Sequence, residues 1–109
     1  MSNNNVKTIN INSRIFSIQY LKFTNGLFVS IWEGSEQKIG GLSLAMKIME
    51  QVNLSTIIPA KYGDNFGLML AETAASESNG IVLISFFASS ELNNSIFQEI
   101  QKDLLNIIQ

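Results

Sequence analysis

The stretch RIFSIQYLKFTNGLFVSIWE, residues 14–33, decides the fold. In Arg14–Thr24, Phe16, Ile18 and Tyr20 share one face of an extended chain, and Leu27–Glu33 is rich in β-branched and aromatic residues, which is typical of β-strands. Asn25-Gly26 separates the two runs. An Asn-Gly pair in this position predicts a type I′ turn, because both central residues of that turn need positive φ. The stretch therefore predicts a β-hairpin.

Strands on either side extend this hairpin into a sheet. Val6–Asn12 alternates, and Asn12-Ser13 supplies residues that favour turns, so residues 6–33 are expected to form a three-stranded meander. Further along, Gly80–Ser89 is apolar at consecutive positions, which is typical of a strand buried on both faces. We therefore expect this later strand to be central in the sheet.

Helical spacing appears between and after these strands. Leu42, Ala45, Met46 and Met49 recur at intervals of three and four residues, which predicts an amphipathic helix. The expected elements after the meander are a helix over 42–51, a short strand over 55–60, a helix over 65–77, the strand 80–89 and a helix over 95–109. The order β-β-β-α-β-α-β-α predicts an α+β fold, a mostly antiparallel sheet with helices packed on it.

Composition excludes several classes of function. The 109 residues fit a polar tail over 1–5 and one domain over 6–109. There is no His and no Cys, so no Ser-His-Asp triad, thiolate nucleophile or Cys/His metal site can form. The net charge is −2 and the basic residues are scattered singly, which argues against binding to nucleic acid. No apolar run is long enough to cross a membrane, so a cytoplasmic protein, also nuclear, is expected.

No set of polar residues predicts catalysis, a cofactor or a metal. Gly34–Gly41 lacks the Lys-Ser/Thr ending of a phosphate-binding loop. Asp64 is better explained as a residue that caps the following helix, a role that Asn65 can also fill, than as a catalytic acid. Glu33 and Glu36 give no reason to expect perturbed pKa values. The sequence predicts a non-enzymatic interaction domain.

Large apolar side chains are the best candidates for a partner interface. Trp32 ends a strand, where it can pack in the core or anchor a partner. Phe86 and Phe87 must lie on opposite faces of their strand, so one of them meets solvent or a partner if helices cover only one face. The predicted interface residues are Phe28, Trp32, Met46, Met49 and Phe87.

An ordered series of short matches resembles the proteasome assembly chaperones of the "chaperone four" type, over about residues 15–106. The matching segments are Phe23–Val29, Leu42–Met46, Ser55-Thr56, Gly63-Asp64, Leu70-Ala71, Val82–Ser85 and Phe97–Leu105. Two segments depart from the pattern. The return strand ending at Ile31–Gly34 is longer, and the segment after Ser55-Thr56 is shorter than in animal members, which leaves open whether a family contact near Pro59–Asp64 is kept.

The resemblance implies a subunit that pairs with a related, chaperone-three-type subunit of the same fold. It implies that the pair binds α-type subunits while the α-ring of the 20S proteasome assembles. Which α-type subunit is bound, which face binds it, and whether the isolated chain is a monomer or a homodimer stay open. The alternative is a small dimeric scaffold of the roadblock or longin kind, serving GTPase or trafficking complexes. Those folds often open with a helix, whereas this chain opens with strands.

Overall fold

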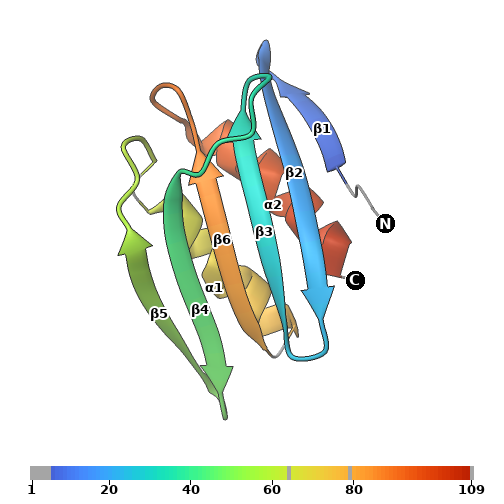
Figure 1. Ribbon diagram of the computed structural model, residues 1–109, viewed down its shortest axis with the longest axis vertical. Helices are drawn as coiled ribbons and strands as arrows, with labels where there is room; N and C mark the ends of the chain where they lie inside the picture. The colour runs from blue at the N-terminus through green and yellow to red at the C-terminus, as the bar shows by residue number, and fades with distance from the viewer. Residues whose placement is uncertain (1–5, 64, 79, 109) are drawn as a thin grey trace.

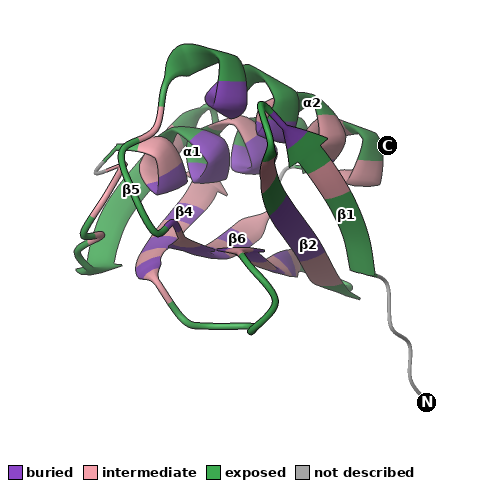
Figure 2. Ribbon diagram, turned by 90° about the horizontal axis from the view of Figure 1, so that it is seen from above, coloured by how far each residue is buried: buried purple, intermediate pink, exposed green. Residues whose placement is uncertain are grey.

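The computed structural model describes residues 6–63, 65–78 and 80–108, and the tail predicted over 1–5 lies outside them. In this part of the chain, six strands form one sheet in the order β1-β2-β3-β6-β4-β5 (Figure 1). Two helices cover one face of the sheet and leave the other without a helix (Figure 2). The elements are β1 Val6–Ile11, β2 Arg14–Phe23, β3 Gly26–Glu33, β4 Gly41–Ile48, β5 Gln51–Ile58, α1 Phe66–Ser78, β6 Ile81–Phe87 and α2 Asn94–Ile108.

The strand pairings confirm the predicted α+β class. β3 and β6 pair in parallel, and the other four neighbouring pairs are antiparallel. β6 lies between β3 and β4, as its apolar sequence predicts for a central strand. The meander predicted over residues 6–33 is also confirmed as β1, β2 and β3.

The hairpin of β2 and β3 forms as predicted, but its turn is not the predicted type I′ turn. Phe23 pairs with Gly26, and neither Asn25 nor Gly26 has a positive φ. Gly26 is needed because a Cβ there would collide with the backbone carbonyl oxygen of Ile81, where β6 begins. The positive φ values lie instead at Asn12 and Ser13, in the turn between β1 and β2. The Asn-Gly pair therefore predicts the correct hairpin, but Gly26 is needed for the close approach of β6 and not for a positive φ.

The helix predicted over residues 42–51 is wrong, and with it the predicted element order. Two antiparallel strands, β4 and β5, occupy residues 41–58, so the order is β-β-β-β-β-α-β-α. Leu42, Leu44, Met46 and Ile48 fit the two-residue period of a strand as well as the apolar positions fit a helix. Pairing with β6 on one side and β5 on the other decides for the strand.

Small residues let α1 pack closely on β4. Ser43 and Ala45 are buried beneath the helix, and a Cβ added at Gly67 would lie 3.0 Å from the Ser43 Oγ. The buried residues of α1 are Gly67, Leu70, Ala71, Ala74 and Ala75. The helix therefore contributes mostly small side chains to the core, which explains the close approach of the two layers.

Both later helices lie where the sequence predicts them. Ile96, Phe97, Ile100 and Leu104 of α2 are buried against the sheet and α1. The Ile96 backbone N–H donates to the Asn93 Oδ1 at 3.0 Å, so Asn93 caps α2. Of the two residues proposed to cap α1, Asp64 lies outside the described residues, and the backbone carbonyl of Asn65 accepts from the Met69 N–H at 2.9 Å. β5 extends the strand predicted over 55–60 and ends directly before Pro59, as expected for that residue.

Candidate partner-binding surface

The face of the sheet without helices carries two continuous rows of mostly apolar residues, which we call the apolar rows. The residues of each row are paired from strand to strand across β2, β3, β6 and β4. The first row is Leu21, Phe28, Leu83 and Leu44, and the second is Phe23, Gly26, Ile81 and Met46. Leu21 is 54% exposed and Phe23 is 60% exposed, so these side chains are not part of the core. Contiguous exposed apolar surface of this kind is typical of a binding surface.

A polar row follows the apolar rows on the same face. It consists of Gln19, Ser30 and Ser85, which lie side by side on β2, β3 and β6. The connection between β3 and β4, residues 34–40, crosses the sheet over this row and is called the strap here (Figure 2). The face is thus divided into a polar part under the strap and an apolar part with no cover among the described residues.

Hydrogen bonds fasten the strap to the polar row. The Gln37 Nε2 donates to the Gln19 Oε1 at 2.7 Å and to the Ser30 Oγ at 3.3 Å. The Gly40 backbone N–H donates to the Ser85 Oγ at 3.1 Å. Each residue of the polar row thus accepts a hydrogen bond from the strap, whereas the apolar rows beside it offer hydrophobic burial to whatever docks there.

Four of the five predicted interface residues lie on this face. Phe28 and Met46 belong to the apolar rows, and Trp32 pairs with Phe87 at the end of β3 and β6. Trp32 is only 7% exposed, whereas Phe87 is partly exposed and has the Lys38 ammonium 5.0 Å from its ring centroid. Phe86 faces the helices and packs on Phe16 and Phe66, as the predicted division of the Phe86-Phe87 pair requires.

Met49, the fifth predicted interface residue, lies apart from the others. It is 89% exposed in the turn between β4 and β5, with a φ of 60° that non-glycine residues seldom adopt. The apolar residues of the rows that were missed at the sequence level are Leu21, Phe23, Leu44, Ile81 and Leu83. A signal was present only for those in β6, because apolar residues occupy consecutive positions in 81–84 although one helical layer can cover only one face.

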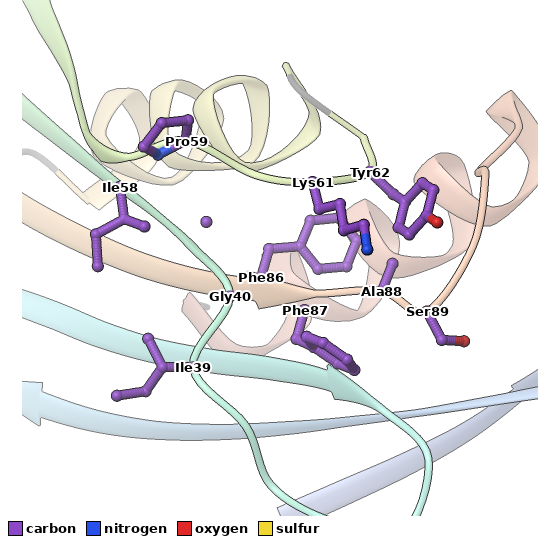
Figure 3. A pocket seen from close by; sticks show the side chains of 11 residues that line it. Ile39, Gly40, Ile58, Pro59, Lys61, Tyr62, Phe86, Phe87, Ala88 and Ser89 are labelled. Atoms are coloured by element: carbon purple, nitrogen blue, oxygen red, sulfur yellow. The ribbon is translucent and has the colours of Figure 1, made fainter.

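A hollow of about 390 Å³ opens where the strap enters β4 (Figure 3). Its lining includes Ile39, Pro59, Phe86 and Phe87, with Lys61 and Tyr62 as the ionisable groups. The Lys61 ammonium lies 5.7 Å from the centroid of the Tyr62 ring, and no carboxylate of the described residues lines the hollow. This lining offers apolar contact and one basic side chain.

An ion pair fixes one end of the sheet. The Arg14 Nε and Nη2 donate to the two carboxylate oxygens of Glu33 at 2.9 and 2.8 Å. Glu33 also accepts from the Ser89 backbone N–H at 2.9 Å, and the Arg14 Nη1 donates to the carbonyl oxygen of Glu91. The hydrogen bonds from Arg14 lower the Glu33 pKa from 4.5 to about 2, despite partial burial. The sequence-level expectation of an ordinary Glu33 pKa is wrong, because its partner lies 19 residues away in the chain.

Acidic metal-binding clusters and membrane-spanning helices are both absent from the described residues. Within residues 6–63, 65–78 and 80–108, no three Asp or Glu side chains gather as they would around a metal ion. Neither of the two helices described there has the length and apolar character needed to span a membrane.

Comparison with known proteins gives a likeness in structure and none in sequence. No protein-family model matches the chain, and no curated protein matches it. Among solved structures, it is similar to a chain in the crystal structure of a novel chaperone complex for yeast 20S proteasome assembly. The TM-score is 0.70 at 14% identity, over 94% of each chain. The fold expected from the resemblance to proteasome assembly chaperones is therefore confirmed, and this chain shares it with a chain of that chaperone complex.

Proposed function

We propose that this chain is a non-enzymatic subunit of a proteasome assembly chaperone. It pairs with a related subunit of the same fold, and the pair binds α-type subunits while the α-ring of the 20S proteasome forms. One observation carries this proposal: the apolar rows are uncovered on a fold that is shared with a chain of a proteasome assembly chaperone complex.

The apolar rows are suited to pairing with another sheet. They span four strands, and their partly exposed side chains can interdigitate with those of a second sheet about 10 Å away. Stable interfaces bury about 1,200–2,000 Å² in total, which a face of this kind can supply. Phe28, Met46 and Phe87 are the proposed anchors, and Trp32 lies beside Phe87 on the neighbouring strand and is almost fully buried.

Met49 is proposed to contact a proteasome subunit and not the related chaperone subunit. Because it protrudes from the turn between β4 and β5, it can reach a proteasome subunit without taking part in the sheet-to-sheet contact. Methionine adapts its shape to irregular apolar surfaces, which suits contact with the surface of another subunit. Residues 6–109 act as one unit in this proposal, in the cytoplasm or nucleus.

Co-expression tests the proposal. The chain is co-expressed with candidate chaperone-three-type proteins and α-type proteasome subunits, and complexes are separated by size exclusion. We expect a complex of the chain with its related partner, and a larger one that also holds an α-type subunit. Separate elution of every component would contradict the proposal, and recovery of small GTPases without proteasome subunits would favour the roadblock or longin alternative.

Two matched variants locate the contact. Leu21→Glu puts a charge into the first apolar row and should weaken pairing with the related subunit by at least about tenfold. Met69→Glu puts the same charge on α1, where Met69 is 44% exposed on the helical side of the molecule. Met69→Glu should leave pairing unchanged; equal loss in both variants would show that the apolar rows are not the contact.

A further inference from the structure

The two edge strands of the sheet differ in how well they are protected. β1 has six residues and carries Lys7, whose ammonium pairs with the Asp103 carboxylate of α2 at 2.7 Å. β5 has eight residues, and no charged residue occurs from Gln51 to Ala60. A short strand and a charged side chain are known protections against pairing of sheet edges, and β5 has neither.

β5 is open along its outer side. Its only partner among the described strands is β4, and seven of its eight residues are exposed (Figure 1). The register of the β4–β5 pair shifts only at Leu42/Ser43, opposite the C-terminal end of β5, and Pro59 follows that end. The part from Gln51 to Thr56 therefore keeps a regular row of free backbone N–H and C=O groups, which a further extended strand can satisfy.

We propose that the outer edge of β5 pairs with β5 of a second copy of this chain, antiparallel and with the twofold axis at Leu54. The result is a continuous sheet of twelve strands, six from each copy. The pairing uses the edge of the sheet, so it leaves the apolar rows free and does not depend on the proposed chaperone function.

The alternation of β5 fits this register. With the twofold axis at Leu54, the Leu54 side chains of the two copies lie side by side. Val52 of one copy lies beside Thr56 of the other, and all of these side chains are on the helical side of the sheet. Asn53 then lies beside Ser55 of the second copy on the opposite side. Apolar and β-branched side chains thus meet one another, and amides meet hydroxyls, which are favourable cross-strand pairs. A shift by one residue would place each of these side chains beside one from the other face.

The flanking charges favour a second copy in the antiparallel direction. Glu50 is the nearest charged residue before the uncharged run, and Lys61 is the nearest after it; both are exposed. Antiparallel pairing brings the Glu50 end of one copy toward the Lys61 end of the other, so opposite charges approach at both ends. Parallel pairing would bring like charges together, which disfavours it.

Crosslinking tests the pairing in a chain that has no cysteine of its own. Leu54→Cys places two thiols side by side at the axis, and mild oxidation should join the copies through one disulfide. Asn10→Cys is the matched control, because Asn10 is exposed on β1 at the opposite edge. It should stay uncrosslinked under the same conditions; equal crosslinking of both variants, or none at Leu54→Cys, overturns the proposal.

Sedimentation of the cysteine-free chain gives an independent measurement. A contact of one edge strand is small, so we expect a reversible dimer over about 10 µM to 1 mM protein. Leu54→Lys sets two like charges side by side at the axis and should weaken this dimer by about tenfold or more, while circular dichroism stays unchanged. Leu21→Lys on the apolar rows should leave the edge dimer intact.

Two results overturn the proposal in this measurement. One is a monomer at every concentration, and the other is a dimer that persists in Leu54→Lys and disappears in Leu21→Lys. The second result would leave the proposed chaperone function standing, because it would place self-association on the apolar rows. Leu54→Lys should still pair with the related chaperone subunit. Loss of the edge dimer therefore bears only on the β5 proposal, and loss of that pairing bears only on the proposed chaperone function.

Discussion

The two faces of the sheet are built from similar residues and differ in what covers them. On β6, Ile84 is fully buried beneath the helices, and its neighbour Leu83 is partly exposed on the other face. The same contrast holds on β3 between Val29 and Phe28. Hydrophobic residues on one face stabilise the fold, whereas those on the other are available to a partner. Residue type alone therefore does not separate core from interface; the position of the helical layer does.

Truncation of neighbouring residues on β6 should show the largest difference between the faces. Ile84→Ala removes a fully buried side chain and should lower the free energy of unfolding by about 3 kcal/mol, because it leaves a cavity. Leu83→Ala is the matched variant on the other face and should cost about 1 kcal/mol or less. Denaturant unfolding measures both; similar losses would show that the face without helices is as well packed as the core.

The ion pair of Arg14 and Glu33 should give the next largest effect, and one that depends on pH. Because the folded protein lowers the Glu33 pKa from 4.5 to about 2, its contribution is present above pH 4.5 and is lost as the pH falls toward 2. Glu33→Gln should lower the free energy of unfolding at pH 7 by about 2 kcal/mol and make little difference near pH 2.

Glu36→Gln is the control for the charge itself. Glu36 is exposed, and its closest basic atom, the Lys38 Nζ, is 3.9 Å away. Exposed pairs of this kind contribute little, so this variant should follow the wild-type unfolding curve at both pH values. A loss in Glu33→Gln that is equally large at pH 7 and pH 2.5 would mean that the ion pair is not its cause.

The strap should contribute less than the ion pair, because its hydrogen bonds lie at the surface of the face without helices. Gln37→Ala removes the bonds to Gln19 and Ser30 and should cost about 0.5–1 kcal/mol. Hydrogen exchange should accelerate at residues 34–40 and stay unchanged in α1. Faster exchange throughout the sheet would instead indicate that the strap holds the fold together.

The smallest effect on stability is expected in the exposed part of the apolar rows. Leu21→Ser should change the free energy of unfolding by less than about 0.5 kcal/mol, because Leu21 is already 54% exposed. The same change should weaken pairing with the related subunit, measured by calorimetry. Unchanged pairing together with reduced stability would contradict the division of roles between the two faces.

Much of the fold could be predicted because local patterns and tertiary contacts agree there. The hairpin of β2 and β3, the central strand β6, and both helices follow from alternation, turn residues and helical spacing. The composition of the face without helices could be predicted only in part. Phe28, Trp32, Met46 and Phe87 were chosen by residue type, and their role as interface residues stays a prediction. Consecutive apolar residues in 81–84 indicated Leu83, but no pattern showed that β2 and β4 contribute Leu21 and Leu44 to the apolar rows.

The sequence by itself determined the α+β class, the absence of His and Cys chemistry, and the positions of most elements. Tertiary structure decided residues 41–58, because their apolar residues fit a helix and a strand equally well until β6 offers a partner. It also decided which face stays open, since β3 and β6 are apolar on both faces and the two helices can cover only one. The side chain sets the hydrophobicity of a residue, but whether it is buried depends on which other elements pack against it.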